Sequence, residues 1–64
     1  MLDISKLNES DNGKIVRVKK HVDCPGGMRG ELVGTTKTTI LVRPFQSTAT
    51  YGYYAAYVKW DNDD

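Results

Sequence analysis

The 64-residue chain has a single cysteine, Cys24, so it can form no internal disulfide. Small secreted domains often depend on disulfides for their stability, and this chain cannot be stabilised in that way. The sequence also has no run approaching the ~20 apolar residues that cross a bilayer, and its first residues lack the basic and apolar parts of a signal peptide. We therefore expect a cytoplasmic protein with no membrane partner.

An excess of charge of one sign is also missing. Nine Lys and Arg residues stand against eight Asp and Glu residues, which leaves a formal net charge of +1. Dedicated nucleic-acid-binding domains are usually strongly basic, so this balance counts against that class without excluding it. The charges are unevenly placed, because basic residues gather before position 21 and acidic residues in the segment 61–64. We expect that acidic tail to be frayed.

Chain length limits the kind of function that fits. A domain of about 60 residues buries only about 60% of the surface that its unfolded chain exposes, which leaves little room for an enclosed active site. We therefore expect one domain over residues 1–64, with no catalytic residues and no cofactor. Small cores are often reinforced by oligomerisation, so a second copy of the chain is among the candidate partners.

Alternation of apolar and polar residues predicts an all-β fold. Extended runs with β-branched or alternating apolar residues occur at 14–20, 31–33, 39–43 and 52–60, and the segments between them are rich in Gly, Pro, Ser, Thr and Asn. A single short sheet buries its apolar face and most of its edges by curling. We predict a small antiparallel five-stranded barrel, with residues 1–12 as a lead-in that pins Leu7 and Ile4 onto the domain.

The inward positions of these strands form the predicted core, and the chain has more aromatic rings than such a core can enclose. Its predicted members are Val16, Val18, Leu32, Ile40, Val42, Tyr54, Ala56, Val58 and Trp60. Four tyrosines fall within Tyr51–Tyr57, and Tyr53 and Tyr57 lie on the opposite face of the predicted last strand. An exposed aromatic patch follows, and aromatic side chains are enriched at protein interfaces.

Three segments carry a resemblance to a known family. The V-x-V run at Val16–Val18, the G-x-x-G-x-[apolar] run at Gly27–Leu32 and the β-branched run at Thr39–Val42 resemble the KOW motif of SH3-like barrels. The whole layout is also similar to small SH3-like proteins of bacteriophage genomes, most of which have no assigned activity. The resemblance implies a small barrel and a nucleoprotein setting, because KOW domains bind RNA or ribosomal and transcription-machinery proteins.

Two surfaces are therefore candidates for a partner. The first is an aromatic face with two long loops, which would bind a protein or a second copy of the chain through Phe45, Tyr51, Tyr53 and Tyr57. The alternative is a KOW-like nucleic-acid site, in which tyrosines stack on bases and phosphates bind Lys14, Arg17, Lys19, Lys20, Arg29 and Arg43. We favour the first, because alternating basic residues on a strand are commonly a solvated edge.

His21, Asp23 and Cys24 carry groups that elsewhere bind zinc or act in catalysis. A structural zinc site takes four protein ligands, and the chain has only one His and one Cys. No third group stands at a spacing that would orient a Cys–His pair, and the Gly26–Gly30 run lacks the ending of a phosphate-binding loop. We expect neither a metal site nor catalysis at these residues.

Overall fold

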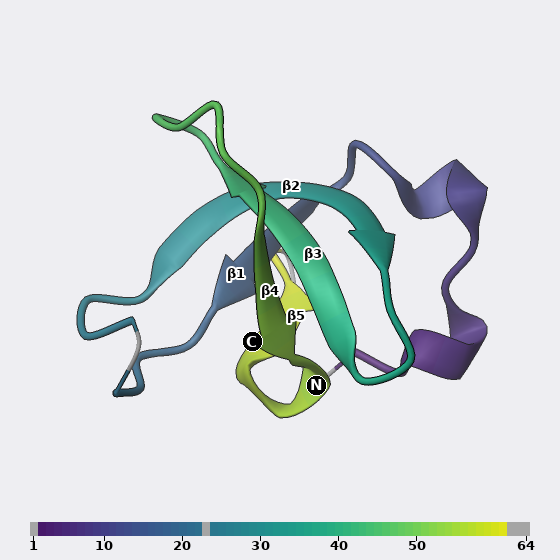
Figure 1. Ribbon diagram of the computed structural model, residues 1–64, viewed down its shortest axis with the longest axis horizontal. Coiled ribbons are helices and arrows are strands. Elements are labelled where there is room, and N and C mark those ends of the chain that lie inside the picture. The colour runs from purple at the N-terminus through teal and green to yellow at the C-terminus, as the bar shows by residue number, and fades with distance from the viewer. Residues whose placement is uncertain (1, 23, 62–64) are drawn as a thin grey trace.

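The computed structural model describes residues 2–22 and 24–61, and its strands form one antiparallel sheet (Figure 1). The strands are β1 (Ile15–Val18), β2 (Met28–Thr35), β3 (Thr39–Pro44), β4 (Tyr51–Tyr54) and β5 (Val58–Trp60). They lie in the order β4-β3-β2-β1-β5. The prediction of a small all-β fold with five antiparallel strands is confirmed.

The only helices in the described part of the chain are short 3₁₀ turns: η1 (Ile4–Lys6), η2 (Glu9–Asp11) and η3 (Ala55–Tyr57). Asp3 and Asn8 cap the first two through their side-chain oxygens, which accept from the backbone amides of Ser5 and Ser10. Among the described residues, no helix has the length and apolar character needed to cross a membrane.

The long strand β2 curves across the molecule and pairs with a different neighbour on each side (Figure 1). The register with β3 slips between Leu32 and Gly34, so a bulge bends the strand at Val33. Because of this curvature, side chains from strands at opposite sides of the sheet reach a common interior. The buried residues form one cluster, to which Val16, Val18, Leu32, Ile40, Val42 and Val58 belong, as predicted.

The N-terminal lead-in contributes more to this core than the sequence indicated. Leu2 is buried, and its backbone amide donates to the Val58 carbonyl at 3.0 Å. Ile4 and Leu7 pack against the same cluster, as expected. The lead-in therefore closes the side of the core near β5.

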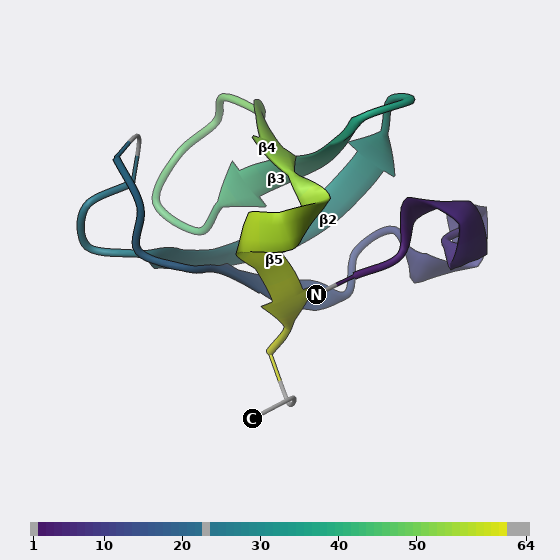
Figure 2. The same ribbon diagram turned by 90° about the horizontal axis from the view of Figure 1, so that it is seen from below.

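The prediction of one continuous strand over 52–60 is wrong, because η3 separates β4 from β5 (Figure 2). A 3₁₀ helix has three residues per turn, so it breaks the two-residue alternation on which the predicted core was based. Tyr54 and Ala56 are exposed and do not belong to the core. Trp60 is half-buried against the core, and so is Tyr53, for which the opposite face was predicted.

Between β1 and β2 the chain forms a loop that borders both candidate surfaces. β1 ends at Val18, before the predicted end at Lys20, although the Lys19 amide still donates to the Tyr57 carbonyl at 2.7 Å. Further along, His21 and Cys24 form an isolated antiparallel bridge with backbone hydrogen bonds of 3.0 and 3.2 Å. Asp23 lies outside the described residues. The loop is therefore folded back on itself beside η3.

Candidate functional site

An apolar hollow lies between the β1–β2 loop, β4 and η3, and we call it the aromatic groove. It has a volume of about 300 Å³ and is lined by His21, Val22, Thr39, Gly52, Tyr53, Tyr54 and Tyr57. The pairing of β1 with β5 brings its walls together, because the Val18–Val58 pair places the residues after β1 beside those before β5. Residues far apart in the sequence thus form one surface.

Ring contacts fix the back wall of this groove. The His21 ring stacks on Tyr57, with centroids 4.2 Å apart and planes 2° from parallel, and meets Tyr53 edge-on at 5.9 Å. His21 Nδ1 lies 2.8 Å from the Lys19 carbonyl oxygen, so in this geometry Nδ1 carries a proton and donates it. The Tyr53 hydroxyl donates to Met28 Sδ at 3.7 Å. Ring and hydrogen-bond contacts thus join His21, Tyr53 and Tyr57 into one wall.

The front of the groove is open to solvent. Val22 is 90% exposed and Tyr54 is 63% exposed, whereas the stacked Tyr57 is 37% exposed. Water in contact with these apolar groups would be released when another apolar surface covers them. The groove thus combines a stacked aromatic back wall with an exposed apolar front.

Only part of the predicted aromatic face lies in the groove. Tyr53 and Tyr57 line it, but Phe45 follows the end of β3 and Tyr51 pairs with Val42 at the start of β4, away from the groove lining. Both are exposed, and the structure does not bring them together with the groove tyrosines into one surface.

Tyr54, His21 and Val22 line the groove but were not among the predicted site residues. The signal that would have found them is the pairing of the first strand with the last, which brings the residues after Val18 beside η3.

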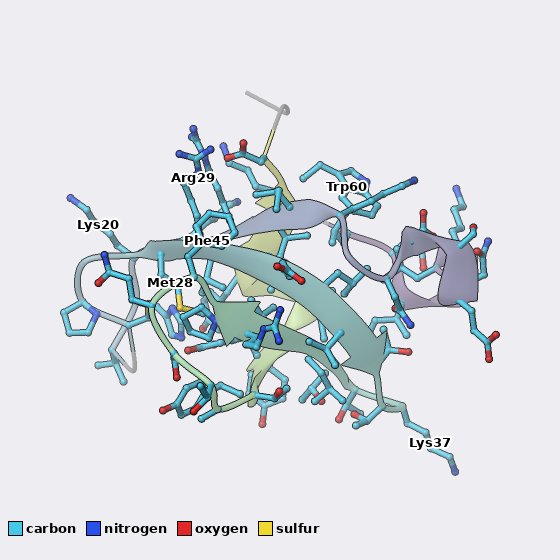
Figure 3. All side chains as sticks on the ribbon, turned by 90° about the horizontal axis from the view of Figure 1, so that it is seen from above. Lys20, Met28, Arg29, Lys37, Phe45 and Trp60 are labelled. Atoms are coloured by element: carbon cyan, nitrogen blue, oxygen red, sulfur yellow. The ribbon has the colours of Figure 1, made fainter. Side chains whose placement is uncertain are left out.

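A second hollow, which we call the basic cavity, is shallow and widely open to solvent and lies along the β1–β2 loop. Its volume is about 590 Å³, and it is lined by Arg17, Val18, Lys19, Lys20, Gly26, Gly27, Met28, Arg29 and Lys59. Strand register assembles part of it, because Arg17 stands opposite both Arg29 on β2 and Lys59 on β5. Lys20 and Arg29 reach out on one side of the sheet, whereas Lys37 stands at the far end of the molecule (Figure 3).

One carboxylate, that of Asp61, balances part of this charge. Arg17 Nε donates to Oδ1 of Asp61 at 3.0 Å, and a terminal nitrogen of Arg29 donates to Oδ2 at 2.8 Å. These hydrogen bonds, that of Arg29 first, lower the pKa of Asp61 below its ordinary value. Lys19, Lys20 and Lys59 form no ion pair with any described residue. Asp61 is thus held in place, while residues 62–64 of the predicted frayed tail lie outside the description.

The predicted nucleic-acid residues divide into two groups. Arg17, Lys19, Lys20 and Arg29 share the basic cavity, together with Lys59, which the sequence interpretation did not include. Lys14 instead pairs with Asp11 at 2.8 Å, with its ammonium 5.5 Å from the Trp60 ring centroid. Arg43 pairs with Glu31 at 2.9 Å. Both are occupied by local carboxylates outside the cavity.

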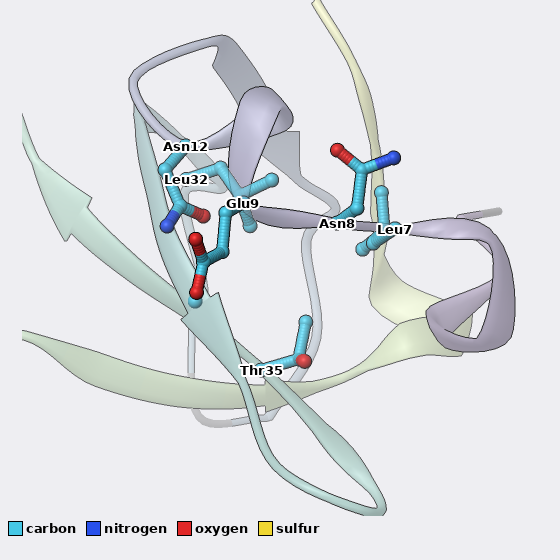
Figure 4. Close-up of a pocket in the computed structure, with 7 residues that line it drawn as sticks. Leu7, Asn8, Glu9, Asn12, Leu32 and Thr35 are labelled. Atoms are coloured by element: carbon cyan, nitrogen blue, oxygen red, sulfur yellow. The ribbon is translucent and has the colours of Figure 1, made fainter.

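A third hollow, of about 210 Å³, lies between the lead-in and β2 (Figure 4). Leu7, Asn8, Glu9, Asn12, Leu32, Gly34 and Thr35 line it. Asn8 is engaged in capping η2, and Leu32 belongs to the core. Leu7 packs against the same core, so this hollow borders a contact between the lead-in and the sheet. Within residues 2–22 and 24–61, no three metal-binding side chains come together.

No protein-family model, curated protein or solved structure matches this chain. The resemblance to KOW motifs and to SH3-like phage proteins therefore stays a prediction from sequence.

Proposed function

We propose that the protein is a non-catalytic binding module that holds a segment of a partner protein in the aromatic groove. The observation that carries this proposal is the exposure of Tyr54 and Val22 beside a back wall fixed by the His21–Tyr57 stack. A fixed aromatic wall loses little conformational entropy when a partner binds, so more of the contact energy appears as affinity. The partner is another protein or a second copy of this chain, and we keep the cytoplasm as its compartment on the single-cysteine argument.

The size and lining of the groove suit a peptide segment. A volume of about 300 Å³ stands at the small end of the range for ligand pockets, which fits one or two side chains of an extended chain. Extended and proline-containing segments dock into aromatic-lined grooves because they are already ordered before binding. The residues at the front supply apolar contact and, through the Tyr54 hydroxyl, a hydrogen-bonding group.

Nucleic-acid binding, the alternative from sequence, is less well supported. Bases stack on open ring faces, and in the groove only Tyr54 is largely exposed, because His21 covers one face of Tyr57 at 4.2 Å and Tyr53 is half-buried with its hydroxyl donating to Met28. The net charge of +1 gives little long-range attraction for a polyanion. The aromatic groove is therefore the better guide to function.

The test is selection from a displayed library of random peptides, followed by measurement of dissociation constants for the enriched sequences by fluorescence anisotropy. The double variant Tyr54→Ser/Val22→Ser should bind them at least about tenfold more weakly, because it removes the apolar front of the groove, and each tenfold is about 1.4 kcal/mol of binding free energy. Tyr51→Ser is the matched control, since Tyr51 is also exposed but does not line the groove.

Two results would count against the proposal. Failure to enrich any peptide would remove its basis, and equal loss of affinity in the Tyr51→Ser control would move the binding surface away from the groove. A steep loss of oligonucleotide binding with salt, abolished by Lys19→Glu/Lys20→Glu, would favour the nucleic-acid alternative instead.

A further inference from the structure

We infer that the basic cavity binds carboxylates of the same partner segment, so that the segment recognised by this protein is acidic. This inference rests on the proposed function and adds a chemical class to it: an extended peptide in which Asp or Glu residues flank the apolar residues held by the aromatic groove.

The two hollows share one wall. His21 and Val22 line the aromatic groove, and the two residues before them, Lys19 and Lys20, line the basic cavity. The same relation holds across the sheet, because the Tyr53 hydroxyl on the groove side donates to the sulfur of Met28, which lines the cavity. The linings of the two hollows are thus adjacent along the chain and across the sheet, so one partner segment that contacts the loop can meet residues of both.

The cavity has more positive charge than the described part of the chain neutralises. Five cationic side chains line it, and Asp61 is the one described carboxylate that pairs with any of them. Lys19 and Lys20 are exposed and Lys59 is half-buried, and none of the three is in an ion pair with a described residue. A ligand that enters the cavity therefore gains most by bringing negative charge.

The hydrogen bonds that Asp61 accepts show which kind of anion fits between the two arginines of the basic cavity. Its two oxygens each accept from a different guanidinium, at 3.0 Å from Arg17 and 2.8 Å from Arg29, so the register of β1 and β2 places the two arginines at the spacing of one carboxylate. Their side chains remain 47% and 54% exposed. Since a guanidinium has five N–H donors, donors remain for a second carboxylate from a partner.

A peptide carboxylate suits this site better than a nucleic-acid backbone does. A nucleic acid places a charge at every nucleotide and needs a long basic track, whereas Lys14 and Arg43, which would extend the track, are neutralised by Asp11 and Glu31. The remaining cations form a compact cluster beside an apolar groove. That pairing of charge and apolar surface matches a peptide with a few acidic residues next to apolar ones.

The experiment uses the full chain and the selected peptides described above. We expect the enriched sequences to carry Asp or Glu next to the apolar positions, and replacement of those residues by Asn or Gln in synthetic peptides to weaken binding about tenfold, a loss of about 1.4 kcal/mol. The variant Lys19→Gln/Lys20→Gln/Lys59→Gln should bind the amide peptides as the wild type does and lose most of the preference for the acidic ones, with Arg17 and Arg29 retaining the rest. Lys37→Gln, a lysine at the far end of the molecule, should keep the preference for acid.

The outcomes separate this inference from the proposed function. Peptides that bind through the groove with no preference for Asp or Glu would overturn the inference and leave the proposed function in place. If no peptide binds, the proposed function fails. Oligothymidylate that binds more tightly than every peptide, and loses its affinity in the triple lysine variant, would assign the cavity to nucleic acid and overturn the inference.

Discussion

Gly30 shows how one residue permits the curvature of the sheet. It stands opposite Pro44 in the β2–β3 ladder, where an added Cβ would lie 2.5 Å from the Arg43 carbonyl oxygen. Gly27, three positions earlier, instead has a φ of +67°, which favours glycine. A left-handed backbone conformation thus favours glycine at Gly27, and the close approach of the β3 backbone requires glycine at Gly30.

We expect Gly30→Ala to lower the free energy of unfolding by about 1–3 kcal/mol, because the β2–β3 backbones must separate to admit the methyl group. Urea denaturation followed by circular dichroism measures this change. Gly26→Ala is the matched control, since no atom lies within 4 Å of its added Cβ and its φ is not positive, so it should leave stability unchanged or raise it slightly. Equal stability of the two variants would contradict the close approach of β2 and β3.

Asp61 is predicted to make stability depend on pH at the acid end. Its pKa is lowered in the folded protein by the hydrogen bonds from Arg29 and Arg17, so the unfolded chain takes up the proton first as the pH falls. The stabilisation is therefore complete above about pH 4, the ordinary range of an Asp carboxyl, and is lost as the pH falls through the lowered pKa.

Denaturation of the wild type and of Asp61→Asn between neutral and acid pH measures this effect. The difference in unfolding free energy between them should shrink toward zero in acid. Taking the difference removes the contributions of Asp3 and Asp11, whose pKa values are also lowered by hydrogen bonds. A difference that stays constant across the acid range would contradict the ion pairs of Asp61.

At the scale of elements, η3 decides which tyrosines face the solvent. Tyr53 ends up against the core and Tyr54 outside it, the reverse of the pattern expected for an unbroken strand. We expect Tyr53→Ala to lower the unfolding free energy by on the order of 1–3 kcal/mol, less than for a fully buried ring, and Tyr54→Ser to change it by less than about 0.5 kcal/mol. Thermal and urea unfolding of both variants measure this, and the reverse ranking would mean that β4 continues without η3.

The short N-terminal lead-in also contributes to the stability of the core. Leu2 is 4% exposed and tied by its amide to β5. Leu2→Ala should therefore cost about 2–5 kcal/mol in the free energy of unfolding, as for other buried leucines. Val22→Ala, at a residue that is 90% exposed, is the control and should be nearly neutral. A neutral Leu2→Ala in urea denaturation would show that the lead-in does not close the core.

Strands with a regular alternation of residue types were predicted from the sequence. The 3₁₀ turn η3, which interrupts the strand predicted over 52–60, was not. Val16 and Val18 alternate with Arg17 and Lys19, so their burial followed from periodicity, whereas Ile40 and Val42 stand on either side of Leu41 in an apolar β-branched run. Tyr53, Tyr54, Ala55 and Ala56 have no such contrast, and a strand and a 3₁₀ turn fit them equally well. Leu2 was missed because its partner, Val58, is distant in sequence and reachable only through the fold.

At the scale of the whole molecule, the sequence predicted which residue types form the candidate site but not which of those residues lie next to one another. An excess of tyrosines predicted an exposed aromatic surface, and basic residues near the first strand predicted a positive one. The pairing of β1 with β5 determines which of them meet, and it puts Tyr57 against His21 and Arg17 against Lys59. That pairing joins the two ends of the chain, so no local pattern could reveal it.

The central claim is that the aromatic groove is the surface at which this protein binds a partner. Chemical-shift mapping of backbone amides, with the uniformly ¹⁵N-labelled protein titrated by a selected peptide, tests it most directly. The largest shifts should fall at Val22, Gly52 and Tyr54, with Lys37 and the hollow beside Leu7 unaffected. Shifts concentrated beside Leu7, or around Phe45 after the end of β3, would contradict the claim.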